Sequence, residues 1–333
     1  MIFSLIVLLF SLAISLGFIH FISQALLYFP WWRGLVQQSG DPLGRHGIAF
    51  HDIEFTGFDT NHTVRGWWVP ALDKATDEAK ENRGITMVVV HGSGKDRYEF
   101  FEQIKVFHQE GLSVMVYDSI DGTGRSDSMG RGIGYSYREH KDVRAAIRFV
   151  KKAYPQHSEK LILTGMSLGG GSVIIAGAKD KDLIDGVIAE SPYAHAGLAW
   201  KHNIYRYLAE GVTHFFKWIQ PPFDSLIPTN PPEWFVDIVI EYTLRNILRN
   251  GGPNMSRDDT PINYVAQISP KPILFIHATQ DPVVPYTHSE ILFKKAQEPK
   301  DFWTINYHIH TTGVHSSSVE AYREKLLTFL KQI

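Results

Sequence analysis

The residue best placed for nucleophilic chemistry is Ser167, which stands between two glycines in the run Gly165-Met-Ser-Leu-Gly169. A serine hydroxyl becomes an effective nucleophile when the backbone exposes it beside a base. The apolar run Leu161–Leu163 predicts a strand, and the small residues from Gly169 to Ala178 predict a helix packed closely on a sheet. A sharp turn between the two would expose the serine, and the glycines would avoid a collision. The alternative interpretation is a glycine-rich turn with an incidental serine.

A carboxylate and an imidazole that could activate this serine follow later in the chain. Asp281 comes just after the apolar run Pro272–His277, which predicts a strand, so we expect it at the mouth of a sheet. His315 lies in a glycine-containing loop between the last predicted strand, 303–307, and the C-terminal helix. We expect Ser167 to attack a carbonyl, His315 to move the proton and Asp281 to hold the histidine tautomer. For Asp281 the alternative is a turn-forming aspartate, since Asp-Pro is common in turns.

Three other histidines compete for the role of base. His308 and His310 alternate with Tyr307 and Ile309 at a strand end, so we expect them to point toward a sheet face rather than into a cleft. The pair also has the spacing of metal ligands, but no cysteine or acidic residue stands beside it, so no metal site is expected. His277 is expected to be a satisfied residue of the core.

The run His91-Gly-Ser-Gly94 directly follows the predicted strand Ile85–Val90. Acyl transfer builds negative charge on an oxygen, and backbone amides aimed at that oxygen stabilise the charge. The expected donors of this oxyanion hole are the amides of Ser93 and of Leu168, the residue after the nucleophile. A phosphate-binding loop is the alternative, but no Gly-Lys-Ser/Thr follows at the required spacing.

The composition is that of an ordinary globular chain. The 333 residues are 44% hydrophobic and 20% charged, which is enough for one large core. The net charge of −2 and the lack of a basic stripe argue against a nucleic-acid partner. Cysteine is absent, which excludes disulfides, thiolate metal sites and a cysteine nucleophile. From residue 84 strands alternate with helices, so we expect an α/β fold with a doubly wound, mostly parallel sheet.

The N-terminal segment predicts a transmembrane helix. Ile2–Phe21 is almost wholly apolar and no formal charge precedes Arg33, and about 20 such residues span a bilayer. Tyr28, Trp31 and Trp32 are typical of an interfacial belt, and the positive charges that follow favour a cytoplasmic catalytic domain. The alternatives are a cleaved signal peptide, which lacks its basic first region here, and a buried core helix.

These patterns divide the chain into five expected segments. The strand–helix alternation breaks in an aromatic-rich helical stretch, which is interpreted as a lid over the strand ends. The segments are a membrane anchor over 1–33, a linker and an N-terminal β-hairpin of the core over 34–83, the first part of the core over 84–193, the helical lid insertion over 194–268, and the second part of the core over 269–333.

With these motifs in order, the segment from Gly84 to Ile333 resembles the α/β-hydrolase superfamily. It is most similar to the serine-aminopeptidase-like or dienelactone-hydrolase-like branch, which includes membrane-anchored members. The resemblance implies the α/β-hydrolase fold, and it implies the same site residues: the nucleophile Ser167, the acid Asp281, the base His315, and the oxyanion donors Ser93 and Leu168.

One departure limits what the resemblance implies. Relatives carry an Asp-Tyr-Arg-Gly-x-Gly-x-Ser turn after the fourth strand, whereas this chain reads Asp118-Ser-Ile-Asp-Gly-Thr-Gly124, without the arginine. The turn borders the site in the family, so substrate preference is not carried over.

The expected function is hydrolysis of carboxylic ester or thioester bonds, with lipid-derived acyl substrates suggested by the anchor and the aromatic lid. The expected partners are a small acyl substrate and the lipid bilayer, and the mechanism needs neither cofactor nor metal. A serine aminopeptidase or amidase is the first alternative, because the same three residues cleave amides. Two others are a non-catalytic membrane-tethered scaffold on this fold and a secreted soluble hydrolase.

Overall fold

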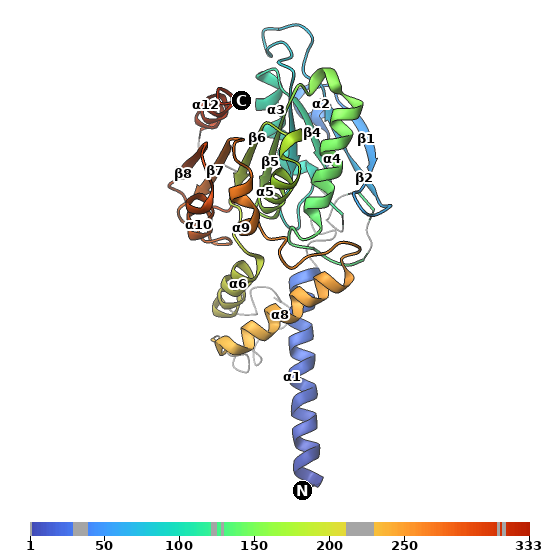
Figure 1. Ribbon diagram of the computed structural model, residues 1–333, viewed down its shortest axis with the longest axis vertical. Coiled ribbons are helices and arrows are strands. Elements are labelled where there is room, and N and C mark those ends of the chain that lie inside the picture. The colour runs from blue at the N-terminus through green and yellow to red at the C-terminus, as the bar shows by residue number, and fades with distance from the viewer. Residues whose placement is uncertain are drawn as a thin grey trace.

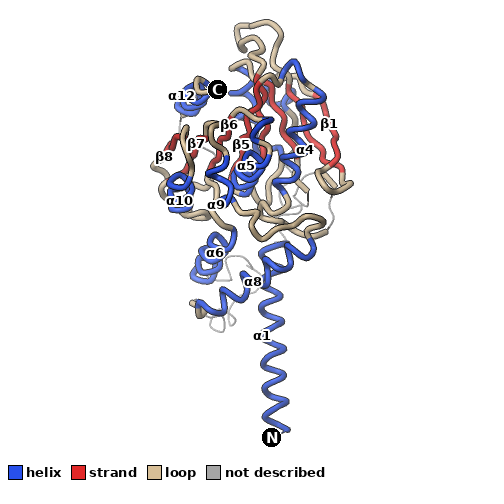
Figure 2. The backbone as a smooth tube through the Cα atoms, in the orientation of Figure 1, coloured by secondary structure: helices blue, strands red, loops and turns tan. Residues whose placement is uncertain are grey.

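The structure is a computed structural model of the whole chain (Figures 1 and 2). It describes the residues 2–28, 39–120, 125–127, 130–210, 230–311, 314 and 318–333.

The core is one eight-stranded sheet in the order β1-β2-β4-β3-β5-β6-β7-β8. The first two strands form the predicted antiparallel hairpin, β2 is antiparallel to β4, and all later neighbours are parallel. The predicted mostly parallel, doubly wound sheet is therefore confirmed. The strands are β1 (His51–Thr56), β2 (Thr63–Val69), β3 (Ile85–Val90), β4 (Ser113–Tyr117), β5 (Lys160–Met166), β6 (Gly186–Glu190), β7 (Ile273–Ala278) and β8 (Lys300–Ile305).

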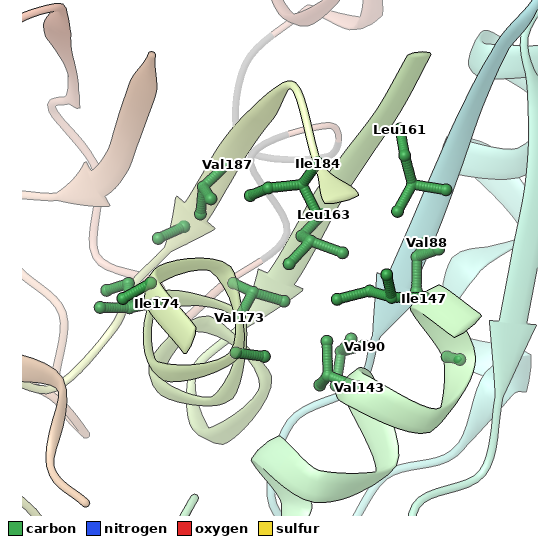
Figure 3. Packing of buried hydrophobic residues seen from close by; sticks show 14 of the residues in the cluster. Val88, Val90, Val143, Ile147, Leu161, Leu163, Val173, Ile174, Ile184 and Val187 are labelled. Atoms are coloured by element: carbon green, nitrogen blue, oxygen red, sulfur yellow. The ribbon is translucent and has the colours of Figure 1, made fainter. Parts of the chain in front are cut away.

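Helices cover both faces of this sheet. The side chains of a strand alternate between the two faces, so Val88 and Leu163 face one helical layer while Val89 and Ile162 face the other. Figure 3 shows the first layer, in which α4 and α5 pack on β3 and β5. The helices of the first layer are α4 (Glu139–Ala153), α5 (Leu168–Lys179) and α10 (Thr287–Lys295), and those of the second are α3 (Phe101–Gln109) and α12 (Val319–Leu330).

Three helices lie beyond the carboxyl ends of the parallel strands. They are α1 (Ile2–Tyr28), α6 (Ala196–Glu210) and α8 (Glu233–Asn250), and Figure 1 shows them grouped on one side of the sheet. The helices α6 and α8 come between β6 and β7 in the chain, within the segment expected to form a lid. Two short helices complete the described α-helices: α2 (Pro42–His46) and α9 (Pro261–Tyr264).

Candidate active site

Ser167 occupies a sharp turn between β5 and α5. Its backbone has φ 54° and ψ −113°, and a positive φ is strained for a residue with a side chain. The flanking glycines permit the turn. A Cβ on Gly165 would stand 2.3 Å from the Gly169 carbonyl oxygen, and a Cβ on Gly169 would stand 2.2 Å from the Val90 carbonyl oxygen. Any larger residue would push the strand, the turn and the helix apart.

Backbone hydrogen bonds hold this turn in place. The Ser167 amide donates to the Glu190 carbonyl at 2.8 Å, and the Ser167 carbonyl accepts from the Gly171 amide at 3.0 Å. The residue directly precedes α5, so it sits at the positive end of that helix's dipole. The location favours negative charge that develops beside the serine.

The loop after β3 lies against the serine. A Cβ on Gly92 would stand 3.5 Å from Ser167 Cβ. His91 holds this loop, because its Nε2 accepts from the Ser119 amide at 2.9 Å and its Nδ1 lies 2.8 Å from the Gly92 carbonyl. An Nε2 that accepts leaves the proton on Nδ1, which donates to Gly92. The Ser93 hydroxyl is buried and has no hydrogen-bond partner among the described residues.

A buried hydroxyl cluster fixes Leu168, the residue after the serine. The Leu168 carbonyl accepts from Ser136 Oγ and from Ser172 Oγ, each at 2.9 Å. Ser136 Oγ also lies 2.7 Å from the Tyr193 hydroxyl. Three hydroxyls from separate segments thus restrain the first turn of α5. Ser136 and Tyr193 could not be predicted from the sequence, because nothing in the chain pattern around them indicates this contact.

Asp281 lies three residues beyond the end of β7 and is almost fully surrounded by donors. Its Oδ1 accepts from the amides of Val283 and Val284, at 2.8 and 2.9 Å. Its Oδ2 lies 2.7 Å from His310 Nδ1 and 3.2 Å from His277 Nε2. Burial by itself would raise the pKa of this carboxyl, but the hydrogen bonds from His277 and His310 outweigh burial and hold the pKa well below its usual value. Asp281 is therefore an ionised acceptor.

His277 is a satisfied core residue, as predicted. It is fully buried on β7, with Nδ1 2.6 Å from Ser289 Oγ and Nε2 2.9 Å from the Val284 carbonyl. Since Nε2 faces two oxygen acceptors, Val284 and Asp281, it carries the proton.

The prediction that His310 points toward a sheet face is wrong. The strand β8 ends at Ile305, earlier than expected, so His308 and His310 follow it in irregular backbone and need not alternate. The Nδ1 of His310 reaches Asp281, and its side chain is 19% exposed. His315, the predicted base, lies outside the described residues.

Buried residues near the predicted site residues share hydrophobic clusters. Leu168, which follows Ser167, and Val284, three residues after Asp281, belong to one cluster. Met166 and Val314, which directly precede Ser167 and His315, belong to another.

Comparison with known proteins identifies similar chains. Residues 80–235 match the family described as serine aminopeptidase, S33. The uncharacterized protein YfhR of Escherichia coli K12 is 24% identical over 280 residues, which cover 84% of this chain and 79% of the relative. The uncharacterized membrane protein YNL320W of Saccharomyces cerevisiae is 26% identical over 54% of this chain and 58% of its own.

Two solved structures have a similar fold. The Pyrococcus furiosus esterase Pf2001 has a TM-score of 0.64 at 19% identity, covering 90% of this chain and 97% of its own. The α/β hydrolase GrgF from Penicillium has a TM-score of 0.60 at 22% identity, covering 86% and 99%. These likenesses confirm the predicted fold class.

Proposed function

We propose that this chain, which has the α/β-hydrolase fold, is a serine hydrolase that cleaves carboxylic ester or thioester bonds through an acyl-enzyme. The observation that carries the proposal is the backbone of Ser167, with φ 54° at the sharp turn before α5. Such strain costs about 1–3 kcal/mol and persists where the surroundings enforce it, commonly at active sites. A glycine-rich turn with an incidental serine would place glycine there instead.

In the proposed mechanism Ser167 Oγ attacks the carbonyl carbon while a histidine takes its proton. The same histidine returns the proton to the leaving oxygen or sulfur, and a water molecule then releases the acyl group. Asp281 stays ionised and holds the histidine. The predicted oxyanion donors, the amides of Ser93 and Leu168, are supported by the packing of Gly92 against Ser167 and by the positive end of α5.

We propose His315 as the base and keep His310 as the second candidate. Its place in the loop after the last strand supports His315, as does the burial of Val314, the residue before it, in the same hydrophobic cluster as Met166. The contact of His310 Nδ1 with Asp281 favours His310, since the acid of such a triad binds Nδ1 of its histidine. A carboxylate offers about four acceptor sites and all four on Asp281 are used, so the two histidines would compete for one oxygen.

The choice of esters over amides rests on one structural neighbour. The structural neighbour Pf2001 is an esterase, whereas the matching family is named for aminopeptidases. A fluorophosphonate probe tests for the nucleophile: it should label the purified full-length chain and not the Ser167→Ala variant. Absence of labelling in both would favour a non-catalytic scaffold. A panel of acyl esters, acyl thioesters and amino-acid anilides then separates esterase from peptidase, with preferred turnover of anilides overturning the ester proposal.

We further propose that α1 anchors the chain in a membrane. The helix from Phe3 to Tyr28 is long and apolar enough to cross one, and a signal sequence would pass the same test. The yeast relative is called a membrane protein. Sequencing the N-terminus of the chain from cells, together with carbonate extraction of membranes, distinguishes an anchor from a cleaved leader.

A further inference from the structure

Burial along α1 changes abruptly at Ile19. Every described side chain from Phe3 to Phe18 is exposed, whereas Ile19, Leu26 and Leu27 are buried in a cluster with residues of α6 and α8. The first part of the helix thus projects from the protein and the last part belongs to its core, as Figure 1 shows.

The exposed part of α1 is the part available to the bilayer. Its described side chains are exposed up to Phe18, and burial against α6 and α8 begins at Ile19. An α1 that spans a membrane would therefore leave the hydrocarbon core at about the level of Ile19 to Phe21, beside the helices that pack on it.

The helix α8 lies at this level. Phe18 stacks on Phe235, near the start of α8, with ring centroids 5.9 Å apart. Two residues further along α1, His20 Nδ1 lies 2.9 Å from the Tyr242 hydroxyl. The first residues of α8 therefore lie beside the part of α1 that is nearer the bilayer, and its later residues lie nearer the sheet. Figure 1 shows the start of α8 as the end farther from the sheet.

The start of α8 exposes apolar side chains. Trp234 is 64% exposed and Ile238, one turn later on the same side, is 45% exposed. Charges flank them, because Lys201 of α6 pairs with Glu233 and, at 3.2 Å, with Asp237. An apolar stripe containing tryptophan, bordered by charged groups, is typical of a helix at the interface between headgroups and acyl chains.

We infer that the first two turns of α8 lie in the interface of the bilayer that holds α1, with Trp234 and Ile238 inserted between lipids. The inference rests on the proposed anchor and extends the proposed function to a substrate class. Leu168, beside the nucleophile, shares one hydrophobic cluster with Ile19 of α1 and Val236 of α8. This packing places the nucleophile turn on the side of the sheet where α1, α6 and α8 lie, and the substrate class that fits this position is an ester of that same membrane.

Because the chain contains no cysteine, a fluorophore can be attached at one chosen position to measure how deep that position lies in the bilayer. Single cysteines replace Trp234, Ile238, Leu9 or Leu183 in the full-length chain and carry an environment-sensitive fluorophore. Leu9 reports the free part of α1, and Leu183, exposed at the amino edge of the sheet, reports the aqueous side. The protein is reconstituted in phosphatidylcholine vesicles with a nitroxide either at the headgroup or at mid-chain.

We expect mid-chain quenching at position 9, headgroup quenching at positions 234 and 238, and none at position 183. Quenching at position 9 without any at 234 and 238 would overturn the inference while leaving the anchor intact. No quenching at position 9 would overturn both the anchor and the inference, whereas fluorophosphonate labelling of Ser167 would still stand.

A second measurement tests the substrate class. The double variant W234E/I238E should lower the ratio of vesicle-borne long-chain ester hydrolysis to soluble short-chain ester hydrolysis by about tenfold, as two apolar contacts with lipid are lost. The matched control is E241Q/R245Q, on the same side of α8 but nearer the sheet, which should leave the ratio unchanged. An equal fall in both activities would point to a misfolded lid and overturn the assignment of these side chains to lipid.

Discussion

Replacing His310 and His315 one at a time decides which histidine activates the serine. Glutamine is the matched substitution, because its amide can still donate to Asp281 but cannot take a proton from Ser167. On the proposed mechanism His315→Gln removes the base, whereas His310→Gln changes only one of the four donors around the carboxylate.

The structure sets the size of each effect. Asp281 keeps the amides of Val283 and Val284 and the ring of His277 when His310 is replaced. Exchanging the ring donor for an amide donor alters one hydrogen bond to the carboxylate by about 1 kcal/mol, which corresponds to about fivefold in rate. Loss of a general base instead lowers kcat by about 10² to 10⁴.

The assay is single-turnover acylation of the full-length protein by a short-chain ester, followed across pH 5 to 9. Ser167→Ala provides the background, and circular dichroism checks that each variant is folded. We expect the large loss in His315→Gln and a wild-type pH profile in His310→Gln. A loss above a hundredfold in His310→Gln, with His315→Gln near wild type, would refute the assignment and make His310 the base.

Three further predictions follow from the packing around the site. Gly169→Ala should destabilise the fold by about 2 kcal/mol or more in urea unfolding, because its Cβ would stand 2.2 Å from the Val90 carbonyl oxygen. The control Gly92→Ala, whose Cβ would have contacts no closer than 3.5 Å, should change stability little. Equal losses of stability in the two variants would contradict this prediction. Ser136→Ala should lower kcat severalfold at unchanged KM, because the Leu168 carbonyl loses one of its two hydroxyl donors. A change in KM alone would show that Ser136 does not position the turn that carries Ser167. Burial lowers the pKa of His288 to about 4, below its unfolded value of about 6.5, so the folded state resists its protonation. The stability from neutral His288 is full above about pH 6.5 and falls toward pH 4 by up to about 3 kcal/mol, and His288→Gln should flatten this slope in denaturant titrations.

The fold class and the nucleophile turn could both be predicted from the residues alone. Each follows from a short-range pattern. The strand–helix alternation from residue 84 predicts the fold class, and the glycines two residues before and after Ser167 predict the turn. These patterns work because the sterics of a tight turn and the period of a strand depend on neighbouring residues alone. The apolar start of the chain likewise predicted a long helix, which is α1.

The groups that meet around that turn could not be predicted in the same way, because they come from distant parts of the chain. The alternation around His310 predicts that it points toward a sheet face. Instead β8 ends at Ile305, and the Nδ1 of His310 lies at hydrogen-bond distance from Asp281, 29 positions away in the chain. Ser136 reaches Leu168 across 32 positions, and α8 covers only the second part of α1. Contacts over such separations depend on where each strand stops and how each helix packs, and no local periodicity carries that information.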